Sequence, residues 1–281
     1  MHMNRTIRKA LIPAAGAGKR MGYLSSILPK CLFPLAEKPI LHRVVENAML
    51  LGAREFVVVT HFKEHMVQDY CLKTLAPELG VSVEFVHQEK MSGLADAILL
   101  GREFIQEPFA VILGDDYTAA ADFDNVLDMF FRHPQAVVVE GIVPEPSRSQ
   151  LSAACCVERA ADGRILRIQE KPADPFSRFR GTGFYLFRPE VFAMIENTPI
   201  TPLRNEREIT ETIRLLAEAG KGYAEFLRGI NLNINTFDDL LAAWNTHAHL
   251  ASFLASVHFE GGPAPLPEPP PGNEPARKKT P

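Results

Sequence analysis

Glycines and cations follow the first apolar segment of the chain. After KALIPA the sequence reads AGAGKRMG, which contains Gly16, Gly18, Lys19 and Arg20. Another cation, Lys30, follows ten residues later in a Pro-Lys pair. Backbone N–H groups and a guanidinium can surround a phosphate, and the guanidinium can bind it through two parallel hydrogen bonds. A glycine-rich turn alone is weak evidence, but with these cations it predicts a phosphate-binding loop.

Two common phosphate-binding loops are excluded by spacing. A Walker A loop needs a glycine five residues before Gly18, where the chain has Pro13, and a Ser or Thr after Lys19, where it has Arg20. A dinucleotide fingerprint needs a third glycine where Met21 stands. The loop therefore belongs to neither class.

A carboxylate and an amide complete the pattern. The apolar segment FAVILGDD ends in Asp115 and Asp116, and adjacent strand residues point to opposite faces, so we expect only Asp115 to face a ligand. Gln88 ends another apolar segment, and Gly93 lies five residues on. Together these strand-end residues predict a site for a polyphosphate with a divalent cation.

The elements that must position these residues alternate along the first half of the chain. Apolar runs and helical periodicity predict strands over 9–14, 55–60, 81–88 and 109–116 and helices over 39–52, 64–76 and 94–104. This order is typical of a Rossmann-like α/β fold, with a mostly parallel but mixed sheet flanked by helices. In such a sheet the ligand lies beyond the carboxyl ends of the strands, where all the residues above are placed.

The second half of the chain is more mixed. It predicts two strands around a turn within 152–172, a further strand over 181–187, and helices over 189–197 and 207–220. Thr236 is the expected N-cap of a last helix, with Asp239 in a loose capping box. We expect one domain over 1–257, with a nucleotide-type half at about 7–116 and an acceptor half at 117–257, which the resemblance described below makes the sugar-phosphate half. Eight of the 22 prolines lie between Pro263 and Pro281, so 258–281 is predicted to be a disordered tail.

Composition limits the possible partners. The formal net charge of −4 argues against a nucleic-acid binder. The apolar N-terminal segment is too short for a signal peptide or a membrane span, so no membrane partner is expected. The four cysteines have no metal-ligand spacing and are interpreted as reduced thiols of a cytoplasmic protein. A homo-oligomer stays possible.

Five short motifs in order resemble those of a known family, the sugar-phosphate nucleotidyltransferases or NDP-sugar pyrophosphorylases. They are AAGAGKR followed by LPK, QEKMSGLADA, LGDD, EKP at 170–172 and EITE, and the resemblance covers about residues 7–250. It is nearest to the glucose-1-phosphate uridylyl- and thymidylyltransferases. The resemblance implies the nucleotide-diphospho-sugar transferase fold. It also implies transfer of a nucleoside monophosphate from UTP or dTTP to a sugar 1-phosphate, with glucose 1-phosphate the expected acceptor and pyrophosphate released.

The resemblance also implies a role for each site residue. Catalytic roles fall on Arg20, Lys30 and Lys171. Nucleotide binding falls on Ala15, Gly16, Gly18, Lys19, Gln88 and Gly93. Among these, the amide of Gln88 can donate to and accept from a base edge, and Gly93 lets the base approach the backbone. Sugar binding falls on Glu170, Lys171 and Gly183. The cofactor is Mg²⁺, held by Asp115 and Asn233, which suits a cation that takes few protein ligands and keeps water and phosphate oxygens.

Three departures from the family pattern keep alternatives open. Lys19 replaces the usual Thr or Ser, Asn233 replaces a metal-binding Asp, and Ala153 replaces a glycine on the sugar side. The sugar and the choice between UTP and dTTP are therefore not fixed. A cytidylyl- or guanylyltransferase acting on another phosphate is an alternative, as is a non-catalytic homologue that binds nucleotide sugars.

Overall fold

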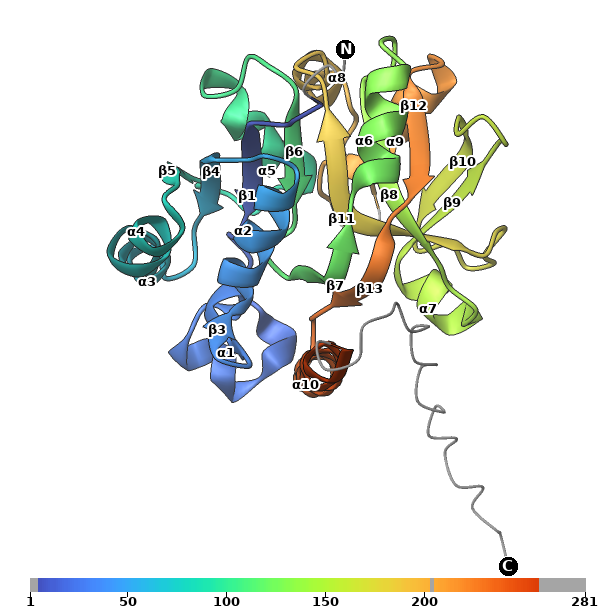
Figure 1. Cartoon of the computed structure of the whole chain (residues 1–281). Helices are drawn as coiled ribbons and strands as arrows, with labels where there is room; N and C mark the ends of the chain where they lie inside the picture. Colours follow the sequence, from blue (N-terminus) through green and yellow to red (C-terminus); the bar gives the residue numbers. More distant parts are fainter. Residues whose placement is uncertain (1–4, 203–204, 258–281) are drawn as a thin grey trace, which may run out of the picture.

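One large mixed sheet forms the centre of the molecule (Figure 1). The computed structural model describes residues 5–202 and 205–257. Seven strands follow one another in the order β10-β9-β11-β6-β1-β4-β5, while β8 pairs with β11 and β12. The strands of this sheet are β1 (Lys9–Pro13), β4 (Glu55–Thr60), β5 (Ser82–His87), β6 (Phe109–Ile112), β8 (Val138–Pro144), β9 (Cys155–Arg159), β10 (Ile165–Glu170), β11 (Phe179–Phe187) and β12 (Gly222–Phe226).

The half of the sheet built by the N-terminal part of the chain is parallel. β1 pairs in parallel with β4 and β6, and β4 pairs in parallel with β5. The apolar runs of β4 and β6 are buried because helices cover both faces of the sheet. Ile12 packs on the α2 side, whereas Leu11 packs with the α5 residues on the other side. The predicted Rossmann-like α/β fold is confirmed.

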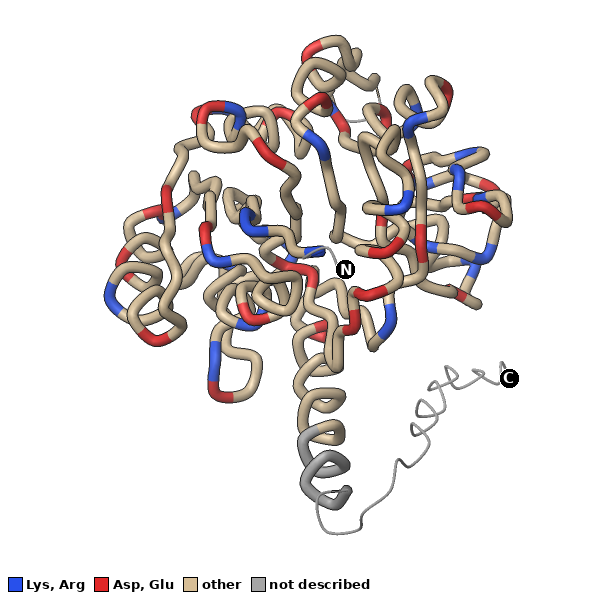
Figure 2. Tube along the Cα trace, turned by 45° about the horizontal axis from the view of Figure 1, so that its top comes forward, with Lys and Arg blue, Asp and Glu red and all other residues tan. Residues whose placement is uncertain are grey.

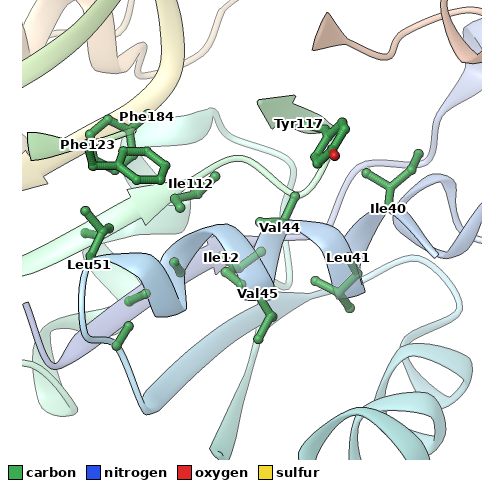
Figure 3. Close-up of a cluster of buried hydrophobic side chains, with 14 of the residues drawn as sticks. Ile12, Ile40, Leu41, Val44, Val45, Leu51, Ile112, Tyr117, Phe123 and Phe184 are labelled. Atoms are coloured by element: carbon green, nitrogen blue, oxygen red, sulfur yellow. The ribbon is translucent and has the colours of Figure 1, made fainter. Parts of the chain in front are cut away.

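Helix α2 shows how one face is covered (Figure 3). Its apolar residues recur at helical spacing, and Ile40, Val44 and Val45 are essentially buried. They belong to the same cluster as Ile12 of β1 and Ile112 of β6, and Figure 3 shows these side chains between the helix and the sheet. Burial of a large aliphatic side chain contributes about 1.5–3 kcal/mol, so this face fixes the strands that carry the site.

The helices are mostly short. They are α1 (Tyr23–Ile27), α2 (Ile40–Leu50), α3 (Glu64–Tyr70), α4 (Ala76–Leu79), α5 (Leu94–Leu99), α6 (Asp124–Arg132), α7 (Arg148–Ala153), α8 (Val191–Glu196), α9 (Ile209–Glu218) and α10 (Phe237–Val257). The helix predicted over 64–76 continues to Leu79 through one π-helical segment at Cys71–Leu75.

Strand β11 joins the two halves of the chain in one sheet. It runs antiparallel to β6 on one side and to β8 on the other. The predicted strand pair of the second half is present as β9 and β10, which are antiparallel. No described helix is both long and apolar enough to cross a bilayer. The predicted tail, 258–281, lies outside the described residues.

A small second sheet was not predicted from the sequence. β7 (Asp116–Asp122) and β13 (Arg228–Asn233) pair antiparallel, with Asn233 opposite Asp116. A third pair is formed by the two-residue strands β2 (Pro34–Leu35) and β3 (Lys38–Pro39). The β7 sequence, DYTAAAD, has no apolar run, so its strand depends on pairing with a distant segment. This pairing brings the end of β13 to the carboxyl end of β6.

Candidate active site

The phosphate loop, residues 14–22, follows β1 directly. Gly18 has φ 62°, in the left-handed region that favours glycine. A Cβ at Gly18 would lie 2.9 Å from the Cβ of Lys30. The glycine therefore allows the loop to turn closely over Lys30. Lys19 and Arg20 form a short 3₁₀ turn with Met21, and both cations are exposed.

A pocket of about 310 Å³ opens beside this loop at the carboxyl ends of the parallel strands. Six of the predicted residues line it: Ala15, Gly16, Lys30, Gln88, Gly93 and Asp115. Seven others are outside its lining: Gly18, Lys19, Arg20, Glu170, Lys171, Gly183 and Asn233. The structure thus gathers most of the predicted nucleotide-side residues in one cavity.

Lys30 contacts both a carboxylate and an amide at the edge of the site. Its Nζ forms an ion pair with Oδ2 of Asp115 and lies 3.3 Å from Oδ1 of Asn235. The same Oδ1 accepts a hydrogen bond of 2.6 Å from Nη2 of Arg20. Two cations ten residues apart in sequence therefore converge on one amide oxygen, beside the strand-end carboxylate.

Asn235 is a site residue that we did not predict. Its Nδ2 donates to Oδ1 of Asn233, and its backbone N–H donates to Asp239 Oδ2 at 2.9 Å. Thr236 and Asp239 form the expected capping box: Asp239 N donates to Thr236 Oγ1 at 3.2 Å and Thr236 N donates to Asp239 Oδ2 at 2.7 Å. The start of α10 therefore holds Asn235 in place. The sequence feature that could have indicated Asn235 is that it is a second asparagine, two residues after Asn233.

Replacing Asn235 by Asp tests whether the Asn235 amide positions Arg20 and Lys30 for a phosphate. The substitution keeps the shape but adds a negative charge beside Lys30 and Arg20, where it would bind both cations and repel phosphate. We expect affinity for inorganic tripolyphosphate, measured by calorimetry, to fall about tenfold or more, equal to at least ~1.4 kcal/mol. Asn197→Asp, which adds the same charge at the end of α8, should leave this affinity unchanged. Equal affinities in both variants would contradict the role.

The predicted base-reading residues are adjacent in space. Gln88 is buried, and its Nε2 donates to the carbonyl of Gly93 at 3.3 Å. Gly93 has φ 120°, and a Cβ there would lie 2.3 Å from the carbonyl oxygen of Arg207. Glycine is therefore required for packing against Arg207 as well as for any approach of a base. The contact of either residue with a base stays a prediction.

The predicted sugar-side residues lie around the end of β10. Oε2 of Glu170 accepts a hydrogen bond of 3.1 Å from Thr210, at the start of α9. Lys171 is exposed, has φ 45° and is anchored by its backbone N–H, which donates to Ala154 O at 2.9 Å. A backbone held in this unusual conformation at a strand end is typical of a functional position.

Gly183 occupies a different kind of position. It is buried in β11, and a Cβ there would lie 2.7 Å from Cγ of Leu113 and 2.8 Å from Cβ of Asp116. Its N–H donates to Oδ2 of Asp116 at 3.2 Å. Packing against the end of β6 therefore explains this glycine, and a direct sugar contact stays a prediction.

The two neighbouring aspartates differ in environment. Asp116 is buried, and burial raises the pKa of its carboxyl to about 6. Its oxygens accept hydrogen bonds from Asn231 Nδ2 and from Gly183 N. Asp115 is partly exposed and lines the pocket. The structure therefore separates a structural carboxyl, Asp116, from a carboxyl that lines the pocket beside Lys30, Asp115.

The oxygen donors at this point fit a hard divalent cation. Asp115 offers a carboxylate and Asn233 an amide oxygen, and such ligands suit Mg²⁺ rather than a transition metal. Among the described residues, no three His, Cys, Asp or Glu side chains are grouped so as to hold a metal. A cation bound here would therefore take its remaining ligands from phosphate and water.

The order of strands, the glycine-rich loop with its cations and the strand-end carboxylate are those expected of an α/β enzyme that acts on nucleotides. The chain belongs to the nucleotidyl transferase family, whose sequence model matches residues 9–249. The resemblance drawn from the sequence motifs is confirmed.

Individual proteins of known name and solved structure are also similar to this chain. The chain is 30% identical over 236 residues to the bifunctional protein GlmU of Methanocaldococcus jannaschii, covering 84% of this chain and 52% of that protein. It is 30% identical over 220 residues to a glucose-1-phosphate thymidylyltransferase of Streptomyces griseus, covering 76% and 58%. A crystal structure of UDP-glucose pyrophosphorylase complexed with UDP-glucose is similar with a TM-score of 0.76 and 27% identity, over 87% of this chain and 100% of that one. The chain thus spans little more than half the length of the two curated relatives.

Proposed function

We propose that this protein transfers a nucleoside monophosphate from UTP or dTTP to a sugar 1-phosphate, with glucose 1-phosphate as the expected acceptor. The observation that carries the proposal is the convergence of Arg20 and Lys30 on Asn235, beside Asp115, where Lys30 and Asp115 line the pocket. Two cations and a carboxylate at the end of a parallel sheet suit a triphosphate bound with Mg²⁺. The similarity to pyrophosphorylases of UDP-glucose and dTDP-glucose type supports the same substrates.

The proposed reaction is a single displacement. An oxygen of the sugar 1-phosphate attacks the α-phosphorus of the triphosphate, the bond to the β-phosphate oxygen breaks, and pyrophosphate leaves. The nucleophile is already an anion, so no general base is required. Positioning and charge stabilisation then carry the rate. Arg20 and Lys30 hold the triphosphate, and Lys171 holds the sugar phosphate.

The proposed metal site lies beside Lys30. Asp115 and Asn233 would hold Mg²⁺, which would supply positive charge to the phosphate oxygens. Asp115 is paired with Lys30, so the Lys30 ammonium lies beside the carboxylate that would hold the cation. Lys30 is therefore placed to bind a phosphate next to this site.

One buried carboxyl near the sugar side, Glu140, is held in its neutral form. Glu140 of β8 is buried, and burial together with nearby Glu170 raises the pKa of its carboxyl to about 8. A Cβ at Gly181 would lie 2.2 Å from Glu140 Oε1, so glycine leaves room for this side chain. With that pKa, Glu140 is mostly uncharged at neutral pH. It therefore adds little repulsion toward a sugar phosphate.

A screen of substrates tests which nucleoside triphosphate and which sugar 1-phosphate the protein accepts. Release of pyrophosphate is measured for ATP, GTP, CTP, UTP and dTTP, each with several sugar 1-phosphates and Mg²⁺. We expect turnover with UTP or dTTP and glucose 1-phosphate. The two bases differ by one methyl group, worth only ~1 kcal/mol of burial, so both are candidates. Turnover with only CTP or GTP would favour a cytidylyl- or guanylyltransferase. If the protein binds nucleotide sugars but shows no turnover with any triphosphate, it would be a regulatory homologue.

A further inference from the structure

An apolar groove lies on the surface between residues 24–34 and the first turns of α10. It is about 520 Å³ in volume and is separate from the nucleotide pocket. None of the described residues that line it is an Asp, Glu, Lys or Arg. Its main apolar residues are Leu24, Ile27, Phe33, Phe237, Leu241 and Trp244. We call this surface the α10 groove.

Large apolar side chains of the α10 groove are exposed. Ile27 is 53% exposed, Phe237 48%, Leu241 47% and Trp244 41%. Single exposed apolar side chains are ordinary, whereas several that line one recess are typical of a binding surface. Two of these four are aromatic, and aromatic-lined grooves are the surfaces that recognise proline-rich segments in the polyproline II conformation.

The chain carries a segment of matching chemistry shortly after α10. Residues 263–271 read PAPLPEPPP, with six prolines in nine residues and one charged residue, Glu268. Because proline fixes φ, a segment of this kind loses little conformational freedom when it binds in an extended form. Its composition prevents it from forming a core of its own, but not from binding to an apolar surface.

The segment is long enough to return to the α10 groove. Figure 2 shows the helix that leads to the C-terminal trace extending away from the body, and its tan part carries no blue or red beyond its start. Val257 is 13 residues beyond Trp244 and 20 beyond Phe237, which corresponds to about 20 Å and 30 Å along the helix axis. The 14 residues from Val257 to Pro271 span about 43 Å at ~3.1 Å per residue. Residues 263–271 can therefore turn back along α10, pass both aromatic rings and reach the opposite wall.

We propose that residues 263–271 bind in the α10 groove of their own chain. The connection to α10 gives the segment an effective concentration on the order of 1 mM at the groove. A contact whose Kd is on the order of 0.1 mM for a separate peptide would then occupy about nine-tenths of the grooves. The wall over residues 24–34 includes Lys30, so the bound segment would also hold the part of the chain that carries this cation. The inference does not depend on the proposed catalytic activity.

Binding of a synthetic peptide of residues 261–275 tests the proposal by calorimetry, with the full chain and with a shortened chain that ends at Val257. The residues of both hydrophobic clusters are retained in the shortened chain, so it should fold, and circular dichroism checks this. The shortened chain should bind the peptide with a Kd on the order of 0.1 mM, and the full chain about tenfold more weakly, because its own segment occupies the groove. A peptide with serine in place of the six prolines is the matched control and should not bind.

Substitutions in the shortened chain locate the binding site. Ile27→Asp combined with Leu241→Asp places a charge on each wall of the groove and should abolish binding of the peptide. Both side chains are about half exposed, so the fold should tolerate the changes; Leu241→Asp alone is the second variant if the pair does not fold. Leu72→Asp alters an equally exposed leucine in the π-helical segment after α3 and should leave the affinity unchanged.

Four results would overturn the proposal. If the shortened chain does not bind the peptide, the segment is not the occupant, and binding to phosphatidylcholine vesicles would then assign the groove to a membrane surface. Equal affinities of the shortened and full chains would show that the segment does not occupy the groove. Binding that persists in the folded groove variants would place the peptide site elsewhere. Weak binding by a full chain that sediments at twice its mass of 31.2 kDa would show that the segment occupies the groove of a second copy.

Discussion

Replacing Asp115 by Asn is expected to lower kcat by about 100-fold or more. The amide keeps the size of the side chain but removes the negative charge that would hold Mg²⁺ beside the triphosphate. Loss of one charge-stabilising group at a transition state has effects of this size. The measurement is steady-state pyrophosphate release at saturating Mg²⁺. Asp69→Asn, at an exposed position of α3, should retain the wild-type rate.

A second readout separates a metal ligand from a structural aspartate. The Mg²⁺ concentration for half-maximal activity should rise in the Asp115 variant, and the melting temperature should change little because Asp115 is partly exposed. A wild-type rate in excess EDTA would show that the metal assignment is wrong. A large loss of melting temperature would instead point to a structural role.

Lys30→Ala and Lys171→Ala should damage different halves of the reaction. Both lysines are expected near phosphates, so either loss should lower kcat/KM. Lys30 lines the nucleotide pocket and pairs with Asp115, so Lys30→Ala should weaken binding of triphosphate and pyrophosphate. Lys171 follows β10 on the sugar side, so Lys171→Ala should raise the KM for the sugar 1-phosphate and spare binding of triphosphate alone. A loss of ~3 kcal/mol, about 100-fold, is the expected size for each.

Calorimetry decides between the two lysines, because KM equals an affinity only when chemistry is slow. Triphosphate is titrated into each variant with the sugar phosphate absent. Lys221→Ala is the control, since it removes an exposed lysine at the other end of the sheet, just before β12. If Lys30 and Lys171 variants lose triphosphate affinity equally, the two residues share one site and this division of the cleft is wrong.

The parallel half of the fold was predictable because its strands carry their own signal. β4 and β6 are continuous apolar runs, and α2 repeats its apolar residues at helical spacing. β7 and β13 have no such signal. Their pairing is between segments more than a hundred residues apart. β7 has no strand pattern of its own, and the alternation of apolar and polar residues in β13 is short. Tertiary pairing, rather than local preference, makes these strands.

The same difference explains which residues of the candidate site could be predicted from the sequence. The phosphate loop, Gln88 and Asp115 directly follow strands or strand-like runs, and the ends of parallel strands meet at one edge of the sheet. Asn235 reaches the site only through the β7–β13 pairing and the cap of α10. For Gly183 the resemblance implies a sugar contact, which stays a prediction, and the space beside Leu113 and Asp116 also requires a glycine.

Trp244 is the single tryptophan of the chain, and its position makes it a built-in optical reporter. Its indole N–H donates to the carbonyl of Pro34 at 2.7 Å, and the ring is partly exposed in an apolar groove between residues 24–34 and the start of α10. Pro34 follows the short turn that begins at Lys30, so the indole joins α10 to the segment that carries a phosphate-binding cation. Selective excitation of this ring therefore reads a single point of the molecule. Its emission wavelength follows the local polarity there, without any attached dye.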